Sequence, residues 1–136
     1  MSTCRPTLAV VLLALVGTLP ACTQAEQLAQ DAMNGASTIN ADWSTNATGN
    51  RSMVGRRYTY VCPPNGQFAT VWGSGPYTDD SSVCTAGVHA GAISRQSGGR
   101  VLIEMREGMS SYPASTRNGV ETLSYPSWEG SFVVVR

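Results

Sequence analysis

The sequence contains little charge: acidic and basic residues together make up 13% of its 136 residues, and the basic residues are all arginines. Once Arg5 is set aside, the remaining arginines and the nine acidic residues leave a net charge near −1. Binding to nucleic acid requires clustered positive charge, which this composition does not provide. We therefore expect no nucleic-acid partner.

Long hydrophobic runs are also missing, apart from one at residues 8–19, which follows Arg5. This run falls short of the ~20 residues of a membrane-spanning helix and is typical of a secretory signal. The sequence LPAC at residues 19–22 resembles a bacterial lipobox, so we predict that residues 1–21 are removed and that Cys22 becomes acylated. The alternative is cleavage after Ala25, which would release a soluble exported protein.

Cysteine is scarce, with four residues in all. Cys4 would leave with the signal and Cys22 would carry lipid, so Cys62 and Cys84 remain as a pair. In an exported chain such a pair usually forms a disulfide. A zinc site of Cys62, Cys84 and His89 is disfavoured, because positions 84 and 89 point away from each other on a helix.

A short central helix is predicted at about residues 81–91. Ser82 and its neighbours Asp79, Asp80 and Ser81 can cap its first N–H groups, and Gly91 is a usual stop. Small and apolar residues cover most of its sides, so we expect it to be buried. Gly87 within it suggests that another backbone passes close by.

Short strands are expected on both sides of this helix, at residues 57–62, 68–72, 100–106, 120–125 and 131–135. Asn118-Gly119 is a strong tight-turn signal. We predict an α+β domain at residues 56–136, in which two small antiparallel sheets wrap around the helix. Residues 22–55 are predicted to be a linker rich in Ala, Asn, Ser and Thr, although Trp43 suggests that the domain begins near residue 40.

These features occur in an order that resembles the LCCL domain family. The resemblance rests on Tyr77, Ser81-Ser82-Val83-Cys84, Ala86, Val88-His89-Ala90-Gly91, Gly98-Gly99, Val101, Gly108, Tyr112, Ser115, Asn118-Gly119-Val120, Trp128, Ser131 and Phe132. It implies a central helix between two sheets and an extracytoplasmic binding or structural module without catalytic activity. Animal members carry two disulfides, and Cys62 and Cys84 match the second.

The candidate ligand surface consists of Trp72, Tyr77, Asp79 and Asp80, next to the glycine-rich loop at residues 73–76. Exposed aromatic rings there could stack on a sugar. Calcium binding by the two aspartates is the weaker reading, because helix capping explains them. No cofactor or metal is expected.

His89 is expected to be a core residue that bonds to Thr85 or to the backbone of a neighbouring strand. A catalytic pair with Ser82 is disfavoured, because the two residues lie about 10 Å apart along one helix at ~1.5 Å per residue. We group His89 with Asn118 and Gly119 as structural residues.

The resulting hypothesis is a bacterial envelope protein, periplasmic or anchored in the outer membrane by its lipid. Its partner would be a polysaccharide or lipopolysaccharide. The alternative is a structural or protein-interaction module with an envelope protein as its partner.

Overall fold

The computed structural model describes residues 35–136, so the predicted signal, the lipidation at Cys22 and the cleavage after Ala25 lie outside the described residues. The elements in chain order are β1 (Ser37–Asn40), the 3-10 turn η1 (Thr48–Asn50), β2 (Arg57–Cys62), β3 (Tyr77–Thr78), α2 (Val83–His89), β4 (Gly99–Met109), β5 (Thr116–Arg117), β6 (Val120–Glu121) and β7 (Trp128–Val134). None of the helices among these residues is long and apolar enough to cross a membrane.

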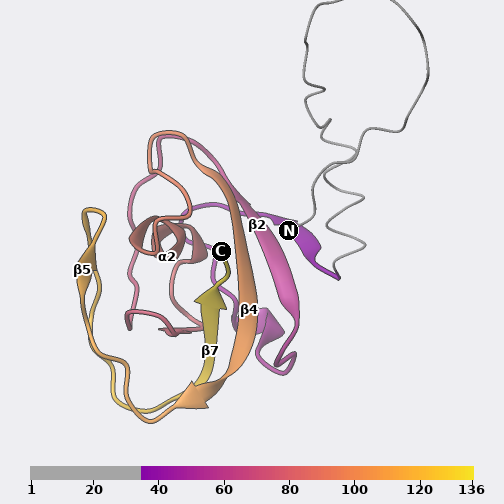
Figure 1. Ribbon diagram of the computed structural model, residues 1–136, viewed down its shortest axis with the longest axis vertical. Coiled ribbons are helices and arrows are strands. Elements are labelled where there is room, and N and C mark those ends of the chain that lie inside the picture. Colours follow the sequence, from indigo (N-terminus) through magenta and orange to yellow (C-terminus); the bar gives the residue numbers. More distant parts are fainter. Residues whose placement is uncertain (1–34) are drawn as a thin grey trace, which may run out of the picture.

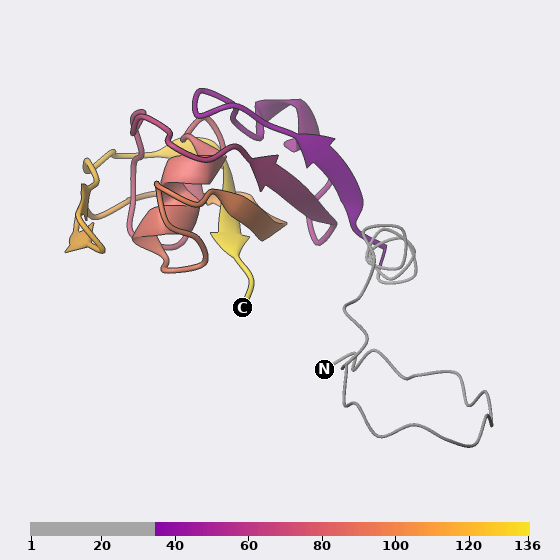
Figure 2. The ribbon, with the colours of Figure 1, turned by 90° about the horizontal axis from the view of Figure 1, so that it is seen from above.

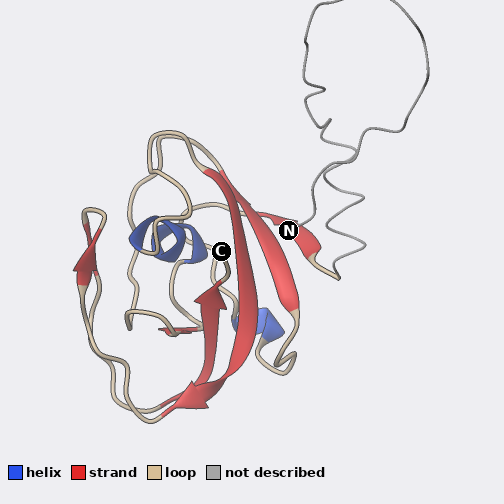
Figure 3. Cartoon of the chain, in the orientation of Figure 1, coloured by secondary structure: helices blue, strands red, loops and turns tan. Residues whose placement is uncertain are grey.

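The strands form a five-stranded sheet in the order β1-β2-β4-β7-β3 and a two-stranded hairpin of β5 and β6. Helix α2 lies between the large sheet and the hairpin, and it contacts β2, β4 and β6 (Figures 1 and 2). Figure 3 shows how much of the remaining chain is loop that runs around the helix. The predicted α+β fold with one central helix and two sheets is confirmed. One detail differs, because β1 pairs with β2 in parallel and the large sheet is therefore mixed.

Helix α2 is buried along its whole length, as predicted. It is shorter than expected: Ser82 is the N-cap and accepts a hydrogen bond from the Thr85 amide at 3.1 Å, and Gly91 ends it with a φ of 79°. Gly87 is required by a close contact, since a Cβ there would lie 2.5 Å from Cγ2 of Val101 on β4. The neighbour is thus a side chain rather than the backbone that we expected.

The disulfide between Cys62 and Cys84 is confirmed, with a sulfur–sulfur distance of 2.03 Å. It joins the end of β2 to the first turn of α2. Since the two sulfurs are bonded to each other, neither can serve as a zinc ligand. Among residues 35–136, no group of three or more His, Cys, Asp and Glu side chains is placed to hold a metal ion.

The core lies between α2 and the large sheet. Strand β4 shows why these residues form a strand: its inward residues Val101, Ile103 and Met105 are fully buried, while Leu102 and Glu104 between them are half-buried. This alternation is the signature of a strand with one covered face. Phe132 on β7 pairs with Met105 and completes the layer.

Residues 37–55 belong to the domain rather than to a linker, in line with the alternative start near residue 40 that Trp43 suggested. Strand β1 pairs with β2 over four residues. Trp43 is 8% exposed, and its indole N–H donates to the Pro63 carbonyl at 3.0 Å. Low charge and many small polar residues made this segment resemble a linker, whereas its role is to cover the edge of the sheet.

The strand predicted at residues 68–72 is wrong. Its N–H groups bond to side chains of the helix and its N-terminal turn: the Ala69 amide donates to Thr85 Oγ1 and the Trp72 amide to Ser81 Oγ, both at 3.0 Å. Its strand pairing is limited to one isolated bridge, between Trp72 and Leu123, so the segment remains a loop that crosses the start of α2.

Candidate functional site

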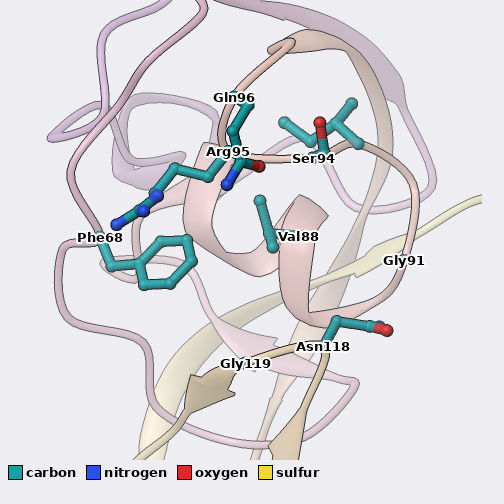
Figure 4. Close-up of a pocket in the computed structure, with 9 residues that line it drawn as sticks. Phe68, Val88, Gly91, Ser94, Arg95, Gln96, Asn118 and Gly119 are labelled. Carbon is teal, nitrogen blue, oxygen red and sulfur yellow. The ribbon is translucent and has the colours of Figure 1, made fainter.

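A groove of about 680 Å³ opens beside α2 and is drawn in Figure 4. Its walls come from three loops and the helix. The lining residues are Phe68, Val88, Gly91, Ile93, Ser94, Arg95, Gln96, Asn118 and Gly119. This volume lies within the range of roughly 300–1,000 Å³ that is usual for small-molecule sites.

Phe68 is the exposed aromatic ring of this groove, with 40% of its surface accessible. The guanidinium of Arg95 lies 5.4 Å from the centre of the Phe68 ring, and Trp43 contacts the ring at 6.3 Å between centroids. Figure 4 shows the Arg95 side chain reaching toward Phe68, with Val88 of the helix to the right of the Phe68 ring. The groove thus combines an aromatic ring and an apolar floor with polar side chains at its rim.

Two loops hold Phe68 and Arg95 in place. The amides of Asn65 and Gly66 donate to the carbonyls of Gln96 and Arg95 at 3.1 and 3.2 Å. Gly66 must be glycine, because a Cβ there would overlap the Trp43 ring. The wall that carries Phe68 is therefore fastened to the wall that carries Arg95.

The opposite wall is the turn at Asn118 and Gly119, whose positive φ values of 51° and 76° agree with the predicted tight turn. The side-chain amide of Asn118 (Nδ2) donates to the His89 carbonyl at 2.9 Å and so holds the turn against the end of α2. Gly119 has open space around it.

A second hollow, of about 420 Å³, is also lined by Phe68. Leu123, which is 49% exposed, and Glu121 line it together with Phe68. Phe68 therefore lines both depressions.

Two residues of the predicted ligand surface are not on the surface. Tyr77 is 2% exposed, because its hydroxyl bonds to His89 Nδ1 at 2.8 Å and its ring packs on Phe132. Asp79 is fully buried. It does not cap the helix, and it binds Arg51 and the indole N–H of Trp128 instead.

Trp72 and Asp80 are half-buried. The Trp72 ring contacts Tyr125 at 6.0 Å, and Tyr125 contacts Trp128 at 5.5 Å. Successive rings are nearly perpendicular, at 72° and 89°, so they do not form the flat platform on which a sugar stacks. The exposed ring that sequence reasoning missed is Phe68, and the turn-forming residues 63–66 just before it are the signal that could have indicated a loop there.

His89 is fully buried and makes different bonds from those expected. Its Nδ1 bonds to the Tyr77 hydroxyl and its Nε2 to Ser115 Oγ at 3.0 Å. Burial, helped by the nearby charge of Arg117, lowers the pKa of His89, so the ring is held neutral. A serine lies within reach of the histidine, but a phenol occupies the place of the carboxylate that orients the base in a hydrolase.

Comparison with models of known protein families matches residues 38–132 of this chain to the LCCL domain. The chain belongs to the LCCL domain family. The matched range begins next to Ser37, where β1 starts, and ends at Phe132 in β7, so it spans nearly all of the described fold.

Several curated relatives of this LCCL domain are animal proteins. Vitrin from Bos taurus is 45% identical over 75 residues, which is 54% of this chain and 11% of vitrin. The human cysteine-rich secretory protein LCCL domain-containing 2 is 44% identical over 57 residues, 42% of this chain and 12% of that protein. Human cochlin is 35% identical over 79 residues, 56% of this chain and 14% of cochlin.

This chain thus spans about a tenth of the length of these relatives. A secretory relative and the Cys62–Cys84 disulfide both agree with an exported LCCL domain. The bacterial source expected from the lipobox stays a prediction.

Proposed function

We propose that this LCCL domain is a non-catalytic module that acts outside the cytoplasm and binds a saccharide unit of an envelope polysaccharide or lipopolysaccharide in the groove beside Phe68. The observation that carries the proposal is the exposed Phe68 ring, set in a groove with an apolar floor and polar side chains at its rim. The faces of sugar rings carry C–H groups that pack on aromatic rings, and their edges carry hydroxyls that need hydrogen-bond partners.

The groove offers both kinds of contact. Val88 and Ile93 are apolar, while Ser94, Gln96 and Asn118 carry hydroxyl and amide groups that can bond to sugar hydroxyls. Arg95 is exposed, so its guanidinium can donate to a sugar while it remains stacked on Phe68.

The proposal includes location. In the bacterial envelope, acylation of Cys22 would anchor the domain to a membrane, and cleavage after Ala25 would leave it soluble. The disulfide supports either form, since both place the domain in an oxidising compartment.

The test is thermal unfolding and titration of the purified full chain with envelope polysaccharide and lipopolysaccharide fractions. We expect a binding fraction to raise the unfolding temperature and Phe68→Ala to weaken its binding about tenfold, the loss typical of a central aromatic contact. Met53→Ala is the matched control, because Met53 is similarly exposed, at 43%, and does not line the groove. The proposal fails if no fraction binds, or if the two variants bind alike.

A protein partner is the second candidate function, favoured by the adjacent exposed side chains of Met53 and Val54, at 43% and 51%. Contiguous exposed apolar surface is a mark of protein-interaction sites. Cross-linking in intact cells that captures one dominant protein, and is lost in Met53→Ser but not in Phe68→Ala, would favour this function over saccharide binding.

A further inference from the structure

A third depression, a recess of about 490 Å³, lies near the groove at the end of α2. The loop at Ser74 and Gly75, the helix end at Ala90, strand β5 and the end of β7 form its walls. Two arginines line it, Arg117 on β5 and Arg136 just after β7. We propose that this recess is a binding site for a phosphate or sulfate group.

The two arginines lack the acidic partner that three other arginines of the domain have. Arg51, Arg57 and Arg106 each form an ion pair with a carboxylate. Within residues 35–136, neither Arg117 nor Arg136 has a carboxylate oxygen in ion-pair range. Two positive charges therefore line one recess without an Asp or Glu side chain paired to either of them.

Local structure holds Arg117 in the recess. Its guanidinium donates to the Ser74 carbonyl at 2.6 Å. In the hairpin, Arg117 pairs with Val120 and Thr116 pairs with Glu121. Adjacent residues of a strand point to opposite faces, so Glu121 faces away from Arg117 and lines the hollow beside Phe68 instead.

Arg136 lies beside Gly91, where a Cβ would be 2.9 Å from its Nη2. The C-terminal carbonyls of α2 do not pair with the Arg136 guanidinium, because they already accept hydrogen bonds from other donors. The Asn118 side chain donates to the His89 carbonyl at 2.9 Å. The backbone N–H groups of Gly91 and Ala92 donate to the carbonyls of Val88 and Gly87 at 2.9 and 2.8 Å.

Both guanidinium groups also act on the buried Tyr77 hydroxyl. Burial raises the pKa of Tyr77, and the charges of Arg117 and Arg136 oppose that rise. The Tyr77 hydroxyl thus interacts electrostatically with both arginines, which agrees with all three residues lining the same recess.

The shape of the charges favours a tetrahedral anion. Each guanidinium can bind two oxygens side by side, and two guanidinium groups together can use three or four oxygens. A phosphate or sulfate group supplies that number, whereas a carboxylate supplies two and is satisfied by one arginine. The site does not depend on saccharide binding, but Gly91 and Asn118 of the groove adjoin Arg136, so an esterified sugar could contact both.

The experiment is calorimetric titration of the full chain at low ionic strength with inorganic phosphate, inorganic sulfate, glucose 6-phosphate and glucose, with chloride at matched ionic strength. We expect phosphate and sulfate to bind, and Arg117→Gln and Arg136→Gln each to weaken binding at least tenfold. Arg56→Gln is the control, since Arg56 is exposed and does not line the recess. The affinity of this variant for phosphate and sulfate should stay within twofold of that of the parent. Unfolding of each variant without ligand shows that it is folded.

The result that overturns the site is binding no stronger than that of chloride, or unchanged binding in both recess variants. Equal affinity for phosphate and glucose 6-phosphate would support a site for the free anion. Tighter binding of glucose 6-phosphate, with the surplus lost in Phe68→Ala, would support a sugar ester as the source. Phosphate binding without any saccharide binding would support this site while refuting the proposed function.

Discussion

Replacing Asp79 with asparagine should destabilise the domain strongly at neutral pH. The side chain is fully buried and accepts three hydrogen bonds, from Arg51 Nε at 2.6 Å, from Arg51 Nη2 at 2.8 Å and from Trp128 Nε1 at 2.8 Å. Through them η1, the approach to α2 and strand β7 are joined. Asparagine preserves the volume but removes the charge and leaves donors without full partners.

The size of the effect follows from these contacts. Removing one member of a buried ion pair costs roughly 3–5 kcal/mol. The Arg51 side chain is 32% exposed and can regain water, so we expect a smaller loss than that range, about 2–3 kcal/mol. For a domain of this size that corresponds to a fall in the unfolding temperature of about 10 °C or more.

The pH dependence gives a second, independent measure. Burial alone would raise the pKa of Asp79, but hydrogen bonds from Arg51 and Trp128 and the charge of Arg51 outweigh it, so the pKa lies below its ordinary value. A carboxyl whose pKa is lowered by folding stabilises the protein above its unfolded pKa of about 3.9 and loses that contribution as pH falls through the folded pKa. The difference in free energy of unfolding between the parent and Asp79→Asn should thus be constant above about pH 5 and shrink below pH 4.

Urea unfolding from pH 2.5 to 7, read by tryptophan fluorescence, measures both quantities. Glu129→Gln is the matched control, because Glu129 binds the same arginine at 2.8 Å but is 73% exposed, and it should change the free energy of unfolding by less than about 1 kcal/mol. Equal losses in the two variants, or a gap that does not narrow in acid, would refute the role given to the buried carboxylate.

Two further variants test the packing of α2. Gly87→Ala should destabilise by about 1–3 kcal/mol, since its methyl would lie 2.5 Å from Val101, and adding Val101→Ala should recover part of that loss; additive losses in thermal unfolding would speak against the clash. Replacing both Cys62 and Cys84 with serine should lower stability by about 3 kcal/mol for a separation of 22 residues. Reductant should lower the free energy of unfolding of the parent by a similar amount and leave that of the double variant unchanged. A parent whose stability does not respond to reductant would contradict this.

The helix and the longest strand could be predicted because local sequence determines them. Ser82, the small residues after it and Gly91 define α2, and the alternation from Val101 to Met105 defines the inward face of β4. Strand β1 could not be found in this way, since its four residues are mostly exposed and polar. Only its pairing with β2, about twenty residues further on, makes it a strand.

The candidate site was less predictable for the same physical reason. Asp79 and Tyr77 are polar residues near a glycine-rich loop, which suggested exposure. Their burial depends on partners distant in sequence, Arg51 and Trp128 for the carboxylate and His89 for the phenol. Conversely, Phe68 was assigned to a strand, and its exposure follows from the path of a loop over the start of α2.

The parallel strand β1 enters the large sheet at one end of the molecule, and the β5–β6 hairpin occupies the other (Figures 1 and 2). A reporter or surface linkage attached ahead of Ser37 would therefore stay clear of Arg117 on the hairpin. The same attachment placed after Arg136 would crowd the recess that this arginine lines. Immobilised or fluorescent versions of the domain should accordingly carry their handle on the β1 side.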